Sequence, residues 1–252
     1  MMKGRRKIFT IVGSFLVVSF ALVIYLVYFS KPGVLPNEKQ MVELIQKDVP
    51  RVGIKTVQDT LTLDERHVVV PFITNKDEYW LSYWEWKRNK WTVLAADTGN
   101  EPKLWKIDKN DPSSYWFVWN FRPENDATSL SFYLLNQRRY GQSNGEEYYY
   151  PQVQLEESVV LTTSPFGVMQ IPKEWQQHHT ELQRIQPKSH TPMYYPFSNI
   201  GYELNLGWIA YDEAHEEIFL SNGSSGNTSY INHNVNVEYI WRLSADQLER
   251  GE

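Results

Sequence analysis

Residues 79–86, which read YWLSYWEW, carry the strongest fold signal in this chain. Successive side chains of a β-strand point to opposite faces, so this stretch places Trp80, Trp84 and Trp86 together on one face. Tyrosine and leucine alternate on the other face. The polar residues 87–90 (KRNK) are typical of a turn, and residues 91–96 return as a second strand. The sequence therefore predicts an antiparallel hairpin with aromatic side chains on both faces.

A helix is predicted ahead of this hairpin. Asn37 is a favourable N-cap residue, and Gln40 follows three residues later, as in a capping box. Apolar residues then recur with helical spacing at Met41, Leu44 and Ile45. A helix that begins after Asn37 would use this apolar stripe to cover the sheet.

Strand and turn signals alternate along the rest of the chain. Helices are predicted after Pro172 and, as one short closing helix, after Ser244. Strands are predicted over residues 115–121, 129–135, 148–161, 206–211, 217–220 and 235–243. Because strands follow strands without intervening helices, a doubly wound parallel sheet is not expected. The predicted fold class is α+β: an N-terminal transmembrane helix, then a helix packed on an antiparallel, meander-like β-sheet and a second mixed β/α segment, with a sub-boundary near residue 162.

Residues 8–29 predict the transmembrane helix. They read IFTIVGSFLVVSFALVIYLVYF and contain neither charge nor proline. At about 1.5 Å per residue this stretch spans about 33 Å, which is enough to cross a hydrocarbon core of about 30 Å. A cleaved signal peptide is the alternative, since Ser19 and Ala21 would suit a cleavage site. Cleavage there would divide the apolar run, which favours a retained anchor.

Basic residues at the N-terminus predict the orientation of this anchor. Lys3, Arg5, Arg6 and Lys7 precede it, and only Lys31 follows closely. Because basic flanks remain in the cytoplasm, the bulk of the chain is expected outside it, in a single-pass protein of the cell membrane. The predicted organisation is a basic cytoplasmic N-terminus (1–7), the transmembrane helix (8–29), a linker (30–36) and an extracytoplasmic globular region (37–252).

Composition restricts the partners and cofactors. Four of the 25 Lys and Arg residues and none of the 30 Asp and Glu residues precede residue 31, so the remainder has a net charge of −9. A charge of this sign argues against nucleic acid as a partner. The chain contains no cysteine, which excludes disulfides, thiol nucleophiles and cysteine-based metal sites. We expect no metal and no cofactor.

The tryptophan face of residues 79–86 is the candidate binding site. The indoles of Trp80, Trp84 and Trp86 could stack on sugar rings or grip apolar side chains of a partner protein. The alternative is that they pack in the core beneath the predicted helix, which is the favoured interpretation for most of them. Since both faces of the strand are aromatic, a sheet with one solvated face would still expose one set.

No complete catalytic motif occurs in the sequence. The run that begins at His215 starts like a zinc-protease motif but has Phe219 where the second histidine is required. Paired acids at 146–147, 156–157, 212–213 and 216–217 could supply the two carboxylates of a glycoside hydrolase, but sequence does not show their separation in space. We therefore predict no catalytic residue.

These observations favour a non-catalytic, membrane-tethered domain that binds a glycan or a protein partner at the cell envelope. One alternative is an envelope-acting hydrolase that uses a carboxylate pair. Another is an accessory subunit of a larger membrane complex, in which the anchor packs against other helices. The sequence does not predict the oligomeric state.

Overall fold

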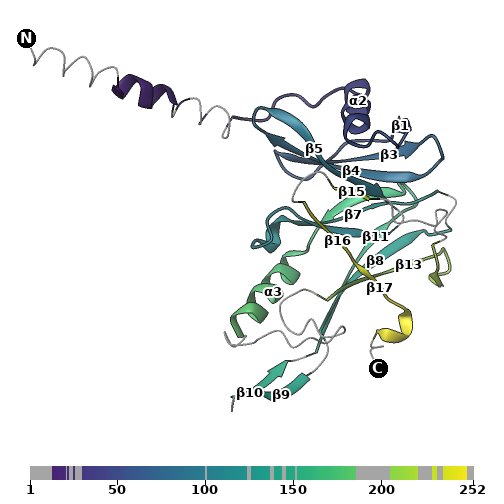
Figure 1. Ribbon diagram of the computed structural model, residues 1–252. Coiled ribbons are helices and arrows are strands. Elements are labelled where there is room, and N and C mark those ends of the chain that lie inside the picture. The colour runs from purple at the N-terminus through teal and green to yellow at the C-terminus, as the bar shows by residue number, and fades with distance from the viewer. Residues whose placement is uncertain are drawn as a thin grey trace, which may run out of the picture.

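The computed structural model describes residues 13–20, 22, 25, 30–99, 101–123, 126–136, 139–143, 146–150, 152–185, 205–220, 229–231 and 235–248. It is a mixed α+β structure with few helices and mainly antiparallel sheets, as predicted (Figure 1). Within the described ranges, no helix is both long enough and apolar enough to cross a membrane. Of the predicted transmembrane segment, only residues 13–20, 22 and 25 are described, all of them helical, and the rest of it lies outside these ranges.

The predicted capping-box helix is confirmed as α2 (Glu38–Asp48). The side chain of Asn37 accepts a hydrogen bond from the Gln40 amide at 3.0 Å, and the Gln40 side chain accepts one from the Asn37 amide at 3.1 Å. Met41 and Ile45 of its apolar stripe are buried. The cap therefore begins the helix where the sequence predicted, and the stripe faces the sheet.

The first sheet contains the predicted hairpin. Its two strands are joined by a two-residue turn in which Arg88 and Asn89 have φ of 53° and 60°, as the tight turns of hairpins require. The strand order is β1-β3-β4-β5-β15, and β2 pairs with β3. The strands are β1 (Ile54–Val57), β2 (Leu61–Thr62), β3 (His67–Thr74), β4 (Tyr79–Lys87), β5 (Lys90–Thr98) and β15 (Ser229–Ile231).

Two further sheets and a separate β-ribbon follow. The second sheet has the order β12-β7-β6-β16, with strands β6 (Lys103–Lys106), β7 (Tyr115–Asn120), β12 (Phe166–Gln170) and β16 (Asn236–Tyr239). The third has the order β11-β8-β13-β14, with strands β8 (Ser129–Asn136), β11 (Val153–Val160), β13 (Leu206–Tyr211) and β14 (Glu217–Ile218). Its edge also holds β17 (Trp241–Arg242), which runs parallel to β13. The ribbon consists of β9 (Arg139–Ser143) and β10 (Glu146–Tyr150).

The three sheets form successive layers beneath α2, and a buried cluster fills each space between them. The first cluster joins Ile45 of α2 to Trp84 of the first sheet. The second joins Tyr83, on the opposite face of the same strand, to Trp105 of the second sheet. Both faces of β4 are therefore covered, which explains why both are aromatic.

The third cluster lies between the second and third sheets. Phe117 of β7 stacks on Phe132 of β8 with ring centroids 4.2 Å apart. Trp175 of α3 (Lys173–Ile185), the helix predicted after Pro172, belongs to the same cluster and lies edge-on to Phe117. This cluster contains residues from both sides of position 162, where the sequence suggested a sub-boundary.

Two strand predictions were wrong in extent. The strand predicted over 148–161 is divided into β10 and β11, which belong to different sheets. The strand predicted over 235–243 is divided into β16, which pairs with β6, and β17, which pairs with β13. In the second case the chain passes from one sheet to the next at the buried residue Ile240. Uniform β propensity does not reveal such a change of pairing partner.

Candidate functional site

The three tryptophans predicted as a binding face lie in the core. Trp80, Trp84 and Trp86 are 1%, 0% and 8% exposed, packed with α2 and β5. The indole Nε1 of Trp84 donates to Ser82 Oγ at 2.9 Å, so the ring is also fixed by a hydrogen bond. Indoles in these positions have no free face on which a sugar ring could stack. The structure therefore places these three side chains in the core, which was the alternative to a binding face.

Part of that core is supplied by the segment 30–36, which the sequence predicted as a linker. Trp91 Nε1 donates to the Gly33 carbonyl at 3.1 Å, and the Trp86 ring lies so close to Gly33 that an added Cβ would sit 2.8 Å from it. Leu35 packs against the same cluster. Arg66 Nη2 donates to the Ser30 carbonyl at 2.7 Å. The segment is thus attached to the domain from its first residue.

A buried ion pair joins the first and second sheets. Lys103 Nζ lies 2.7 Å from Asp97 Oδ2 and donates to the Thr98 carbonyl at 2.6 Å. Tyr83 OH lies 3.5 Å from the other Asp97 oxygen, and Lys103 Nζ is 5.0 Å from the centre of the Tyr239 ring. The side chains of Lys103 and Asp97 are only 2% and 10% exposed.

Burial shifts the proton affinities of this cluster. Desolvation raises the pKa of Asp97 and lowers the pKa of Lys103, and in each case the partner's charge opposes the shift. Burial also raises the pKa of Tyr83 well above its ordinary value. Perturbed groups of this kind occur at active sites and equally in structural ion pairs. With both charges enclosed and hydrogen-bonded, the pair connects β5 to β6.

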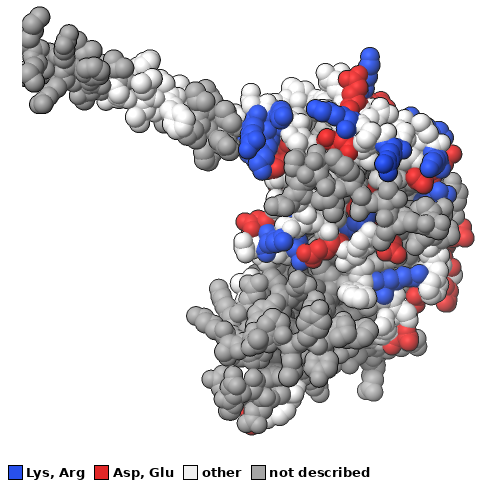
Figure 2. Space-filling view, in the orientation of Figure 1, with Lys and Arg blue, Asp and Glu red and all other residues white. Residues whose placement is uncertain are grey.

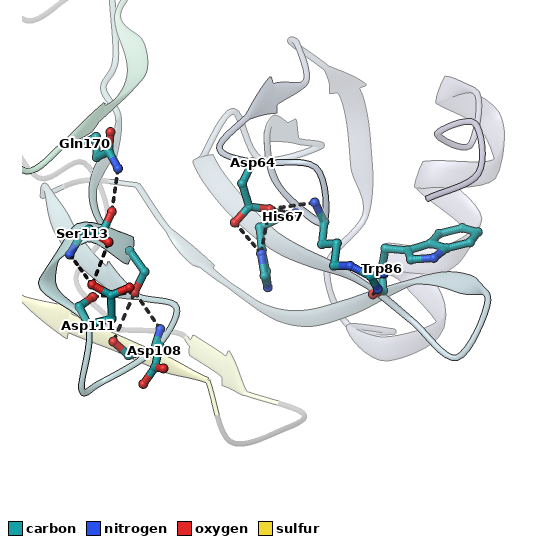
Figure 3. A network of polar contacts seen from close by, with 9 residues as sticks. Asp64, His67, Trp86, Asp108, Asp111, Ser113 and Gln170 are labelled. Atoms are coloured by element: carbon teal, nitrogen blue, oxygen red, sulfur yellow. Dashed lines mark hydrogen bonds and ion pairs between the residues drawn. The ribbon is translucent and has the colours of Figure 1, made fainter. Parts of the chain in front are cut away.

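A second polar group contains Asp64 and His67 (Figure 3). Both carboxylate oxygens of Asp64 lie 2.9 Å from His67 Nδ1, and Asp64 also accepts from the backbone amides of Arg66 and His67. Burial would raise the Asp64 pKa, but these hydrogen bonds and the histidine outweigh it and leave the pKa below its ordinary value. The His67 ring lies edge-on to Trp105. Among the described residues, His67 has no hydrogen bond to a hydroxyl group.

The third polar group surrounds η1 (Pro112–Ser114) and contains Asp108 and Asp111 (Figure 3). Asp111 Oδ1 accepts from the Ser113 amide and hydroxyl at 2.9 and 2.7 Å, and Asp108 Oδ1 accepts from the Asn110 amide at 2.9 Å. These carboxylates therefore stabilise the turn. In the part of the chain that the structure describes, no three His, Asp or Glu residues are placed to hold a metal ion.

Beside this turn lies a shallow pocket of about 300 Å³ between η1 and α3. It contains two acids, Asp111 and Glu181, together with Ser113, Gln176 and Thr180. The paired acids named from the sequence do not line it. Of those, Glu217 instead accepts from the Ala245 amide at 2.9 Å and lies 3.9 Å from Arg242.

Exposed aromatic side chains occur elsewhere, after β14 and on β16 and β17. Phe219, Tyr239 and Trp241 are 76%, 51% and 75% exposed. The Arg242 guanidinium lies 3.6 Å from the centre of the Phe219 ring, so Phe219 is adjacent to the strand that carries Trp241. We call Phe219, Tyr239 and Trp241 the exposed aromatic group. Sequence reasoning missed it because exposure depends on which layer covers each strand.

Fold and surface together define a layered α+β protein of mainly antiparallel sheets, with a docked N-terminal segment. No protein-family model, curated protein or solved structure matches the chain at a significant level. The geometry and chemistry of its own residues therefore carry the functional argument. The basic residues Lys3, Arg5, Arg6 and Lys7, on which the predicted orientation depends, lie outside the described residues.

Proposed function

We propose that the chain is a single-pass membrane protein whose layered domain lies outside the cytoplasm and acts as a non-catalytic binding domain at the cell envelope. The observation that carries the proposal is the uncharged stretch of residues 8–29 behind a basic N-terminus. Its described side chains support this. Apolar residues of the helix, among them Phe15, Leu16 and Val18, are 55–70% exposed and cover no part of the domain.

Apolar helical surface of this kind needs a lipid or protein environment. Membrane insertion is tested by fractionating cells that express the full chain and washing the membranes with alkaline carbonate. We expect the chain to stay in the membrane pellet. Val17→Arg with Val18→Arg should release it, since each arginine near the centre of a helix opposes insertion by about 3 kcal/mol. Val17→Ala with Val18→Ala is the matched control and should remain in the pellet.

Orientation is tested with a single introduced cysteine, because the chain has none of its own. Val34 is almost fully exposed and lies just after the apolar stretch. Val34→Cys should react with a membrane-impermeant maleimide in intact spheroplasts. Reaction only after permeabilisation would place the domain in the cytoplasm and overturn this part of the proposal.

The binding role draws its support from the exposed aromatic group. Aromatic residues and arginine are enriched at protein–protein interfaces, and the exposed Phe219 ring lies against Arg242. We expect the full chain in nonionic detergent to co-sediment with insoluble cell-wall glycan, and Phe219→Ala with Trp241→Ala to abolish this. If neither the wild type nor the variant sediments, a protein partner replaces the glycan in the proposal.

A carboxylate-pair hydrolase is the competing proposal, and the pocket with Asp111 and Glu181 is the observation in its favour. Hydrolysis of cell-wall glycan by the wild type, lost in Asp111→Asn and in Glu181→Gln, would support the hydrolase. Binding without hydrolysis would support the binding domain.

A further inference from the structure

The docked N-terminal segment places the β4–β5 turn beside the end of the apolar stretch. Ser30 follows residue 29 directly, and consecutive Cα atoms are about 3.8 Å apart. The Ser30 hydroxyl donates to Asn89 Oδ1 at 3.3 Å, and Asn89 is one of the two central residues of the turn. Arg66 holds the Ser30 carbonyl from the neighbouring strand connection. A bilayer that contains residues 8–29 would therefore have this turn at its surface.

The same turn is basic. Lys87, Arg88 and Lys90 are exposed, and so is Lys31. Lys87 lies 3.3 Å from Glu85, whereas the other three form no ion pair with any residue that the structure describes. Figure 2 shows Lys and Arg side chains gathered on the side of the domain from which the N-terminal segment leaves. We call Lys31, Lys87, Arg88 and Lys90 the basic tip.

The turn that carries the basic tip packs on two buried tryptophans. Trp86 and Trp91 lie directly behind the turn with their rings 5.6 Å apart, and Trp91 is hydrogen-bonded to Gly33. The turn that carries these residues is therefore attached to the segment that follows the proposed anchor. This local charge is opposite to the net charge of −9 beyond residue 30.

We propose that the basic tip binds anionic phospholipid headgroups and holds the domain in one orientation on the bilayer. The proposal rests on the membrane anchor proposed above. Together with Glu85, which pairs with Lys87, the four residues of the basic tip carry a net charge of +3. Each Lys or Arg near an anionic membrane surface strengthens binding by about fivefold, so three net charges favour the docked orientation by about a hundredfold. The attraction extends over a Debye length of about 10 Å at 0.1 M salt and about 3 Å at 1 M, so salt should weaken it.

The test uses the full chain reconstituted in vesicles of phosphatidylcholine, with or without phosphatidylglycerol. Glu213, in the exposed turn between β13 and β14, is replaced by cysteine and labelled with a fluorescent donor, and the lipids carry an acceptor. Since this turn joins two strands of the third sheet, its distance from the lipid reports the tilt of the domain. We expect energy transfer to differ between the two lipid compositions, and the difference to disappear in about 1 M salt.

The variant Lys87→Gln, Arg88→Gln, Lys90→Gln should give the phosphatidylcholine value in both vesicles. The control removes as many exposed lysines elsewhere, by Lys76→Gln, Lys109→Gln and Lys173→Gln, and should behave as wild type. Equal transfer for the wild type in both lipids would overturn the proposal, as would an equal loss of response in the control. Failure of the chain to float with either vesicle would instead contradict the anchor.

Discussion

Aromatic residues have opposite environments in the first sheet and at one edge of the third sheet. In the first sheet, Trp80 and Trp84 are enclosed by α2 on one face, and Tyr83 is enclosed by the second sheet on the other. At the edge of the third sheet, Phe219 and Trp241 are largely exposed. The difference shows that an aromatic-rich strand is not in itself a surface. Whether a ring can bind a partner depends on whether another layer covers it.

The two regions should differ most when one tryptophan from each is replaced by alanine. Trp84→Ala removes a fully buried ring from the cluster beneath α2, and it leaves Ser82 without its indole donor. We expect it to lower the free energy of unfolding by about 3–5 kcal/mol. Trp241→Ala, the matched variant, should change it by less than about 0.5 kcal/mol.

The measurement is urea unfolding of the full chain in nonionic detergent, followed by circular dichroism, because removing a tryptophan changes the fluorescence. Similar losses for the two variants would show that Trp241 is covered as Trp84 is. That result would also remove Trp241 from the proposed binding surface.

The local part of this arrangement could be predicted from the sequence. The β4–β5 hairpin and the capped helix α2 follow from neighbouring residues, such as the polar turn at 87–90 and the Asn37–Gln40 pair. The layers could not be predicted, because they depend on contacts such as Tyr83 with Trp105 between residues far apart in the chain. The strand β6 has only four residues, and its β structure comes from pairing with β7 and β16.

The candidate sites were harder to predict for the same reason. The sequence gives the residue type but not which side chains other layers bury. It therefore suggested Trp80, Trp84 and Trp86 as a binding face, and it did not indicate that Phe219, Tyr239 and Trp241 are exposed. Asp97 and Lys103 flank an ordinary turn in sequence, and only the stacking of the second sheet on the first buries them. The basic tip combines Lys31 with residues 87–90, which the docked segment brings together through Ser30 and Asn89.

The ion pair between the first two sheets gives the second prediction. Lys103→Met leaves the Asp97 carboxylate buried without its cation, and we expect a loss of about 3 kcal/mol in the free energy of unfolding. Replacing both residues, by Asp97→Leu with Lys103→Met, should restore most of that loss because no buried charge remains. If the double variant were as unstable as Lys103→Met alone, the ion pair would stabilise the fold by its own contacts, and not only by neutralising two buried charges.

The pH dependence of stability provides the control for this interpretation. Because burial raises the Asp97 pKa, the folded state holds that proton more tightly than the unfolded state does above the ordinary value of 3.8. Stability contributed by Asp97 therefore falls as the pH rises through 3.8 toward the raised pKa. Lys103, whose pKa is lowered from 10.5, contributes the opposite slope just below that value. Both slopes should appear in the difference between the unfolding midpoints of the wild type and the double variant measured against pH, because other groups such as Asp64 contribute equally to both proteins.

A smaller loss of stability is expected from a change at the start of α2, the helix that covers the first sheet. Asn37→Ala removes the side chain that accepts from the Gln40 amide, and we expect a loss of about 1 kcal/mol. Asn37→Ser keeps a capping oxygen and should be close to wild type. The effect should be local, because Met41 and Ile45 still anchor the helix to the tryptophan cluster. The rate of amide hydrogen exchange should therefore rise in the first turn of α2 but not in β4. Faster exchange in β4 would show that the cap, and not the apolar stripe, keeps the tryptophans buried.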